Sequence, residues 1–182
     1  TQVLRVDPRT QQAVLVGNQL PDGAFKWSGG VLAADGNIYG IPSVATQVLR
    51  FDPRTQQATL VGAELPGAYK WKGGVLAADG NIYGIPSNAT QVLRFDPRTQ
   101  QATPVGNQLP DGAFKWRGGF PAPARNLYGS PSRATQVLPF YPPTQPATPA
   151  GPELPGAYQC HARLRPAHRN NYTPPSHPPQ LR

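Results

Sequence analysis

The stretch KWKGGVLAADGNIYGIPSNA, residues 70–89, decides the fold because the chain repeats it. Three other segments carry the same pattern with different fidelity: KWSGGVLAADGNIYGIPSVA at 26–45, KWRGGFPAPARNLYGSPSRA at 115–134 and QCHARLRPAHRNNYTPPSHP at 159–178. The first of these is almost identical to 70–89, and the last is barely recognisable. The chain therefore consists of repeated units whose sequence degrades toward the C-terminal end.

The phrase TQVL gives the period of the repeat. It begins at four equivalent positions: Thr1, Thr46, Thr90 and Thr135. The intervals between these positions are 45, 44 and 45 residues, a spacing typical of a propeller blade or a helical repeat. A helical repeat is excluded because no segment carries a sustained apolar stripe at i, i+3 and i+4, and because Gly or Pro interrupts every window of helix length.

Strand signals fill each unit, and the second unit shows them most clearly. Its four short runs are KWKGGVLAA (70–78), NIYGIP (81–86), QVLRFD (91–96) and QATPV (101–105). Asp79-Gly80 predicts a two-residue hairpin turn, because Gly tolerates positive φ. In the next turn Pro97 presets φ, and the Asp96 carboxylate can accept a backbone N–H. Four short antiparallel strands followed by a longer loop predict a propeller blade.

The sequence thus predicts an all-β chain, a β-propeller of about four blades of four antiparallel strands. The repeats occupy 1–156, with complete blades at 25–61, 69–105 and 114–150, and an irregular Pro/Arg/His-rich tail follows at 157–182. Strands at 1–16 and 157–175 are expected to pair and complete a fourth blade, which removes two open sheet edges. The alternative is an open arc, a fragment of a larger ring.

These motifs resemble kelch-type repeats. The resemblance rests on VLRFDPRTQQATLVG at 48–62 followed by GGVLAADGNIYGIP at 73–86, which supply the Asp-Pro-x-Thr hairpin, a Gly-containing strand and a G-x-I-Y strand. It covers three units well, but Ile-Pro follows the I-Y strand where kelch repeats carry a Gly pair. The resemblance implies a kelch-like propeller, a fold whose members mostly serve as interaction platforms.

The second half of the chain opposes this pattern. Residues 1–90 contain 6 prolines and residues 91–182 contain 18, while the net charge is +1 in the first half and +7 in the second. Pro121 and Pro123 stand in the innermost strand of the third blade, where proline cannot donate to a ladder. Several such changes are expected to unfold that blade. Relaxed constraint or a sequence error explains them, or else a specialised capping tail.

A Lys-Trp pair recurs where each long loop enters the inner strand, and its members are the candidate ligand-binding residues: Lys26, Trp27, Lys70, Trp71, Lys115 and Trp116. In the structural interpretation Trp packs between blades while Lys stays exposed. In the functional interpretation Trp stacks on a sugar or base and Lys contacts an anionic or hydroxyl group. Neighbours on a strand point to opposite faces, so the pattern permits both.

Two other repeated motifs have structural interpretations. Gly pairs follow the Lys-Trp pairs at 29–30, 73–74 and 118–119, and they are expected to let the inner strands approach one another rather than to bind phosphate. The turn arginines are Arg9, Arg54 and Arg98. Each has an aspartate two residues before it, which neutralises a ring of positive charge.

No motif predicts catalysis, a metal or a cofactor. Cys160, His161, His168 and His177 lie in the degenerate tail, and their spacing matches no standard zinc site. No apolar run is long enough to span a membrane, and the basic residues arrive with prolines, which disfavours a nucleic-acid partner. We expect a non-enzymatic scaffold that binds protein or glycan; the alternatives are a non-catalytic part of a propeller enzyme, or a decayed repeat product. The chain begins on a repeat boundary without Met, as expected of a fragment, and the sequence indicates no compartment.

Overall fold

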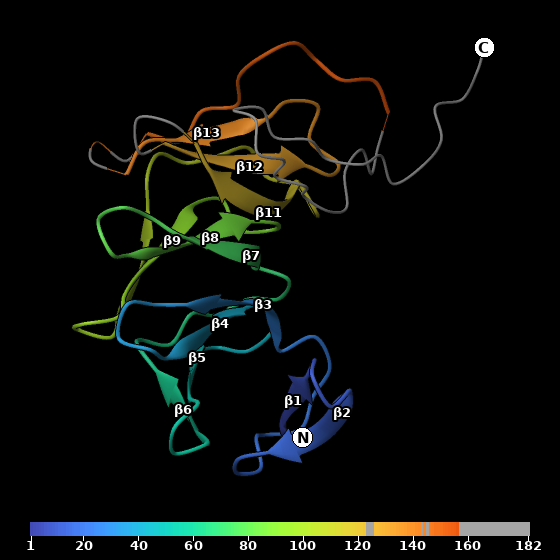
Figure 1. Cartoon of the computed structure of the whole chain (residues 1–182). Coiled ribbons are helices and arrows are strands. Elements are labelled where there is room, and N and C mark those ends of the chain that lie inside the picture. Colours follow the sequence, from blue (N-terminus) through green and yellow to red (C-terminus); the bar gives the residue numbers. More distant parts are fainter. Residues whose placement is uncertain (123–125, 143, 145, 157–182) are drawn as a thin grey trace.

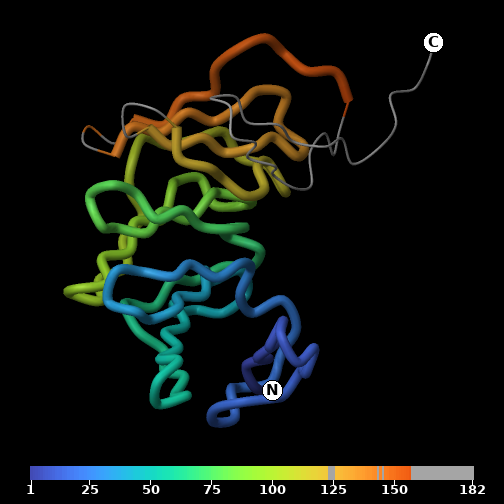
Figure 2. Tube along the Cα trace, viewed as in Figure 1, coloured from blue at the N-terminus to red at the C-terminus, as the bar shows by residue number. Residues whose placement is uncertain are grey.

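The computed structural model of the chain describes residues 1–122, 126–142, 144 and 146–156, and β-strands are the regular structure found there. These strands form four antiparallel sheets, and sequence neighbours pair within each sheet. The all-β prediction is confirmed. Figure 1 shows the sheets stacked one after another along the chain, and Figure 2 shows the chain finishing one sheet before it crosses to the next.

The sheets follow the predicted units closely. The N-terminal hairpin contains β1 (Val3–Asp7) and β2 (Gln12–Val16). The first blade contains β3 (Trp27–Leu32), β4 (Ile38–Pro42), β5 (Val48–Asp52) and β6 (Gln57–Val61). The second blade contains β7 (Trp71–Leu76), β8 (Ile82–Pro86), β9 (Val92–Asp96) and β10 (Gln101–Val105). The third blade contains β11 (Trp116–Pro121), β12 (Leu127–Pro131) and β13 (Leu138–Phe140).

Because strands alternate in direction, each blade has two ends with different connections. The long loops 17–26, 62–70 and 106–115 run between sheets at one end, together with the turns between the second and third strands. We call this end the crossover face. The Asp-Gly and Asp-Pro turns lie at the opposite end, which we call the turn face.

The turn between β7 and β8 differs from the predicted one. The Ala77 N–H donates to the Asn81 carbonyl at 2.9 Å, and the Gly80 N–H donates to the Ala77 carbonyl at 3.1 Å. The loop therefore contains three residues, so the two-residue prediction is wrong. Only Gly80, with φ of 84°, adopts the left-handed conformation, as in a hairpin built from a type I turn and a glycine bulge.

The Asp-Pro turn between β9 and β10 follows the prediction. The Asp96 carboxylate accepts the Arg98 backbone N–H at 2.9 Å and forms an ion pair with its side chain, with Nε 3.4 Å from Oδ1. The turns before β6 and β2 repeat the backbone contact through Asp52 and Asp7. These carboxylates therefore form the turns and offset the charge of the arginine beside them.

Neighbouring blades pack through their inner strands. A Cβ on Gly73 would lie 2.9 Å from the Gly118 Cα, and a Cβ on Gly74 would lie 2.7 Å from the Ile41 Cδ1. The absent side chains let β7 lie between β3 and β11. The prediction that the Gly pairs allow this approach is confirmed.

The core lies between the sheets rather than within one of them. The Tyr39 ring of the first blade packs against Phe95 of the second, with ring centroids 4.9 Å apart. Tyr83 of the second blade meets Phe140 of the third in the same way, at 5.0 Å. All four rings are buried. Each blade is therefore stabilised mainly by its neighbours, as in repeat proteins generally.

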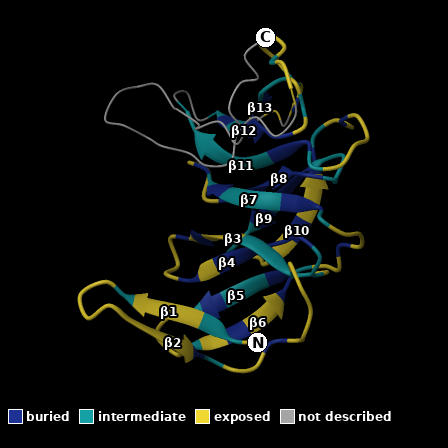
Figure 3. Ribbon diagram, turned by 90° about the vertical axis from the view of Figure 1, so that its right-hand side faces the viewer, coloured by how far each residue is buried: buried dark blue, intermediate teal, exposed yellow. Residues whose placement is uncertain are grey.

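Among the residues that the structure describes, the N-terminal hairpin has no neighbouring blade on one side. Leu4 and Val6 are each 59% exposed, whereas Leu93 and Phe95 at the equivalent positions of the second blade are fully buried. Figure 3 shows β1 and β2 as the largest exposed strand surface. The described sheets form an open arc of a propeller. The predicted pairing of 1–16 with 157–175 lies outside the described residues.

The third blade keeps its inner strands despite its prolines. Pro121 is the last residue of β11 and pairs with Leu127, while β13 pairs with β12. The prediction that prolines unfold this blade is therefore wrong for β11–β13. The fourth strand is reduced to two bridges, Val137 with Ala150 and Phe140 with Ala147. Pro123 lies outside the described residues.

Candidate functional site

The second Lys-Trp pair is built into the junction between two blades. Lys70 is only 4% exposed. Its Nζ donates to the carbonyl oxygens of Ser43 at 3.0 Å, Ala45 at 2.9 Å and Gly67 at 2.9 Å. Ser43 and Ala45 follow the second strand of the first blade, and Gly67 belongs to the crossover loop. The three ammonium donors therefore all have acceptors, and Lys70 ties the second blade to the first.

Lys115 repeats this arrangement one blade later. Its Nζ donates to the carbonyls of Asn88, Ala89 and Gly112 at 3.2, 3.0 and 3.1 Å. Burial lowers the pKa of both lysines, and the nearby Asp111 opposes this shift at Lys115. Lys26 differs, because its Nζ donates to the Pro21 carbonyl of its own loop.

The tryptophans anchor the same junctions. The indole N–H groups of Trp71 and Trp116 each donate at 2.9 Å, to the Gln91 and Gln136 carbonyls respectively. Trp71 and Trp116 are nearly fully buried, and Trp27 is half-buried. The Lys Nζ of each pair lies 5.2 to 6.0 Å from the ring centroid of its own tryptophan.

The expected exposure of the lysines is therefore wrong for Lys70 and Lys115. The bulge after Trp71 in β7 interrupts the simple alternation of the strand, and backbone carbonyls satisfy the buried charge. Each Lys Nζ lies near the ring of its own tryptophan, and Lys70 and Lys115 also bond to carbonyls of the preceding blade. Ligand binding by these residues stays a prediction.

One open pocket of about 400 Å³ includes the second pair. The crossover loop supplies one wall through Leu65–Ala68, and the turn after β8 supplies another through Asn88–Gln91. Lys70 and Trp71 form its floor together, and Pro104 of the edge strand β10 closes the side. Since Nζ of Lys70 already has three acceptors, the pocket offers mainly apolar and carbonyl surface.

The sequence interpretation missed a row of aromatic side chains on the crossover face. The residue before each Lys is aromatic: Phe25, Tyr69 and Phe114. The Phe25 and Tyr69 ring centroids lie 6.0 Å apart, and those of Tyr69 and Phe114 lie 5.7 Å apart. We call these three residues the aromatic row. Its sequence signal was the repeat itself, which holds an aromatic residue at one position in three successive units.

The backbone of the aromatic row is strained. Phe25, Tyr69 and Phe114 have φ of 52°, 53° and 56°, a left-handed conformation that bulky residues rarely adopt. Such strain persists only where surrounding contacts impose it, and it gathers at functional sites. Here the carbonyls of Phe25, Tyr69 and Phe114 accept backbone N–H groups of Val44, Asn88 and Arg133. These contacts fix the position of each ring.

Cations gather at one end of the aromatic row. The Lys72 Nζ lies 4.8 Å from the Phe114 ring centroid, and the Arg133 guanidinium carbon lies 5.3 Å from it. Both distances fall within the range of cation–π attraction. Burial lowers the pKa of Lys72, and the positive charge of Arg117 lowers it further. This end of the row therefore carries concentrated positive charge.

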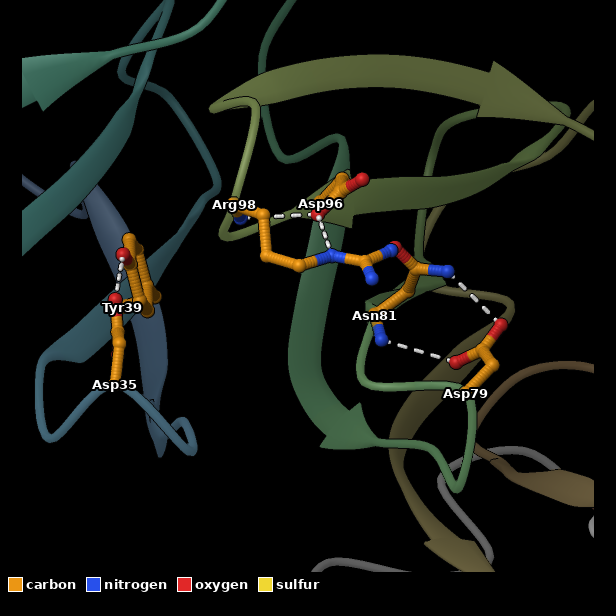
Figure 4. A network of polar contacts seen from close by, with 6 residues as sticks. All are labelled: Asp35, Tyr39, Asp79, Asn81, Asp96 and Arg98. Atoms are coloured by element: carbon orange, nitrogen blue, oxygen red, sulfur yellow. Dashed lines mark hydrogen bonds and ion pairs between the residues drawn. The ribbon is translucent and has the colours of Figure 1, made fainter.

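The turn face carries a different polar network (Figure 4). The Asp79 carboxylate accepts the backbone N–H of Asn81 at 2.9 Å, its side-chain amide at 2.9 Å and the Tyr83 hydroxyl at 2.8 Å. Burial raises the pKa of Asp79, but these hydrogen bonds outweigh it and hold the pKa below its usual value. In the first blade, burial and the hydrogen bond to Asp35 raise the pKa of Tyr39 to about 12. The network holds hairpins together and leaves no carboxylate poised for proton transfer at neutral pH.

Metal sites and membrane-spanning helices are absent from the part of the chain that the structure describes. No group of three or more His, Cys, Asp or Glu is placed there to hold a metal ion. The described segments contain no helix long and apolar enough to cross a membrane. Cys160, His161, His168 and His177 lie outside the described residues.

No protein-family model matches the chain, and no curated protein matches its sequence. Solved structures do share its fold. Virginiamycin B lyase from Staphylococcus aureus is 13% identical with a TM-score of 0.73, over 94% of this chain and 55% of the lyase. This chain therefore spans about half the length of that protein.

Two further solved structures share the fold as well. The extracellular domain of a hybrid two-component system from Bacteroides thetaiotaomicron is 11% identical with a TM-score of 0.65, over 90% of this chain and 23% of that one. An auxiliary nutrient binding protein from Bacteroides ovatus is 12% identical with a TM-score of 0.57, over 87% and 36%. At such identities the likeness shows the fold alone: this chain is an open arc of a β-propeller.

Proposed function

We propose that this chain is a non-enzymatic binding scaffold that holds a protein or glycan ligand on its crossover face. The observation that carries the proposal is the aromatic row, Phe25, Tyr69 and Phe114. Phe25 is 70% exposed, and Tyr69 and Phe114 are half-buried with the same left-handed backbone. Exposed aromatic surface held in a fixed position favours binding.

Two further findings support this function. The pocket at Lys70 and Trp71 opens on the same face and adds a concave apolar surface, as ligand sites commonly have. Proteins of the same fold include a nutrient binding protein and the extracellular domain of a two-component system. The kelch-like resemblance of the Asp-Pro-x-Thr turns favours the same role, because kelch propellers mostly serve as interaction platforms.

The second candidate is a non-catalytic part of a propeller enzyme. The likeness to just over half of virginiamycin B lyase favours it, since the remaining blades of such a protein would then supply the chemistry. The two candidates differ in what this chain does alone: a scaffold binds ligand by itself, whereas an enzyme part requires its missing blades. A decayed product differs from both because it fails to fold. Light scattering with a thermal melt identifies a decayed product. A chain that folds gives a compact 19.5 kDa monomer with a cooperative melt, and a decayed product gives neither.

A glycan and peptide array probed with the full chain, followed by titration of the best ligand, tests the proposal. Phe25→Ala is expected to weaken binding about tenfold, as for a typical aromatic contact residue. Leu15→Ala is the matched control, since Leu15 is 64% exposed on the N-terminal hairpin. Unchanged affinity in Phe25→Ala, or an equal loss in Leu15→Ala, contradicts the proposed site.

A further inference from the structure

The residues beside the aromatic row differ in charge from one blade to the next, although the aromatic position itself is repeated. The residue after each Trp occupies one equivalent position: Ser28 in the first blade, Lys72 in the second and Arg117 in the third. All three side chains are half-buried. At this position the first blade, at the Phe25 end of the row, is therefore uncharged, and the second and third blades are cationic.

Two of the cations at the Phe114 end, Lys72 and Arg117, form no ion pair among the residues that the structure describes. Lys72 and Arg133 both lie over the Phe114 ring, with centroid distances of 4.8 and 5.3 Å. The ion pairs formed in the described residues involve Thr1, Arg54 and Arg98, and not Lys72 or Arg117. Arg117 also lowers the pKa of Lys72, as two cations do without an acid between them. Like charges held together in this way favour an anionic ligand.

Resting on the proposed function, we infer that the aromatic row takes a linear oligosaccharide bearing carboxylate or sulfate groups. Sugar rings lie against Phe25 and Tyr69, and an acidic group meets Lys72 and Arg117 beside Phe114. The aromatic faces supply apolar contact to the C–H side of the sugars. The cations supply charge-assisted hydrogen bonds to the acid.

The surface fits a sparsely charged chain better than a protein or a nucleic acid. A stable protein interface takes roughly 800 Å² and about 20 residues from each partner, whereas the row with its cations is a strip one side chain wide. Nucleic acids carry one negative charge per nucleotide and need continuous phosphate contacts. The exposed acids Asp22, Glu64 and Asp111 on the crossover loops oppose such a polyanion.

Titration calorimetry on the full chain tests the inference with two probes. A hyaluronan tetrasaccharide bears a carboxylate on every second sugar, and its methyl ester has the same sugar backbone with the carboxylates neutralised. We expect the acid to bind about tenfold more tightly than the ester, the effect of a few partly exposed charged contacts. Lys72→Gln should lower the affinity for the acid about fivefold and leave the affinity for the ester unchanged. Arg98→Gln is the matched control, because it removes one positive charge from the turn face.

The substitution Ser28→Lys gives the opposite test at the uncharged end. It places the cation of the second blade at the equivalent position of the first, and binding of the acid is expected to strengthen about threefold. One outcome overturns the inference that the ligand is anionic but leaves the proposed function standing. In that outcome acid and ester bind equally, Lys72→Gln has no effect on either, and Phe25→Ala abolishes the binding of both. Tighter binding of oligo(dT) than of the acid also overturns the inference. If neither sugar, nor oligo(dT), nor an acidic peptide binds in a way that Phe25→Ala weakens, the proposed function fails with it.

Discussion

The second and third blades share the same strand arrangement, but the third blade keeps its inner strands and loses most of its outer strand pairing. Both keep their inner strands: Trp116, Leu127 and Phe140 of the third blade are as buried as their counterparts in the second. The outer half differs, because β10 pairs with β9 over five residue pairs while the third blade has two isolated bridges. Pro139 stands where Arg94 stands in the second blade, and Ala124, outside the described residues, replaces Asp79.

The difference shows where the fold tolerates change. The inner strand β7 contacts β3 on one side and β11 on the other, so its side chains on the two faces stabilise two junctions. Outer strands are edges with one partner, and a proline at an edge sacrifices little of the ladder. The sequence changes in the third blade therefore affect its outer strands first and leave the stack of blades in place. The predictions below test this division.

The largest effect is expected from Lys70→Met at the inner junction. The substitution removes the Nζ donor from three carbonyls, of which, among the described residues, only that of Ser43 keeps another donor, the backbone N–H of residue 70. It should lower the free energy of unfolding by about 4 kcal/mol. Lys115→Met should match it, because the third blade keeps the same clamp. Urea denaturation measures both, with Lys26→Met as the control expected to lose less than about 1 kcal/mol. A small effect at Lys115 alone would mean that the third junction is already loose.

Gly73→Ala should follow, at about 3 kcal/mol. Its Cβ would lie 2.9 Å from the Gly118 Cα, and its φ is 76°. Gly80→Ala separates the two causes, since Gly80 has φ of 84° with nothing within 4 Å, and it should lose only about 1 kcal/mol. Thermal melts of the two variants compare them. Equal losses would show that the close approach of the second and third blades contributes nothing.

The turn-face network should contribute less, and only in the blades that retain it. Asp79→Asn is expected to lose about 1.5 kcal/mol at neutral pH. Because hydrogen bonds hold the folded pKa of Asp79 below its unfolded value of about 3.9, this stability is present above that value and is lost as the pH falls through the folded pKa. Urea unfolding of both proteins between neutral and acid pH measures the effect. The gap between wild type and variant should close in acid, and a constant gap would argue against the carboxylate.

The smallest effect is expected at the outer edge. Pro104→Leu restores the residue that the first blade has as Leu60 in β6, on an exposed edge strand. We expect a change within about 0.5 kcal/mol of wild type, the usual range for a surface site. Urea denaturation of the variant and of wild type measures the difference in the free energy of unfolding. A gain of several times that size would show that outer prolines do limit stability, contrary to the comparison of the blades.

The repeat made most of the fold predictable. Short-range chemistry that recurs in each unit determines the strand positions, the Asp-Pro turns and the glycine contacts. The same pattern in several copies of the repeat therefore supports each of these predictions. The hairpin at Asp79-Gly80 was misread by one residue, since Asp-Gly suits both two- and three-residue loops and the choice depends on how Ala77 and Asn81 pair. The candidate site was less predictable. From the sequence, Lys70 is expected to be an exposed charge. It is buried because carbonyls of the preceding blade, which are distant in sequence, accept its hydrogen bonds.

The sequence by itself determined the blade: its period, its four strands, its turns and its all-β class, because these depend on contacts within one unit. The tertiary structure decided what lies between units. It placed Lys70 and Lys115 inside the junctions, lined up Phe25, Tyr69 and Phe114 across three blades, and gathered Lys72 and Arg117 at one end of that row. The physical reason is that stacking turns one position per repeat into a continuous surface. Whether that position is buried or exposed depends on the blade packed beside it.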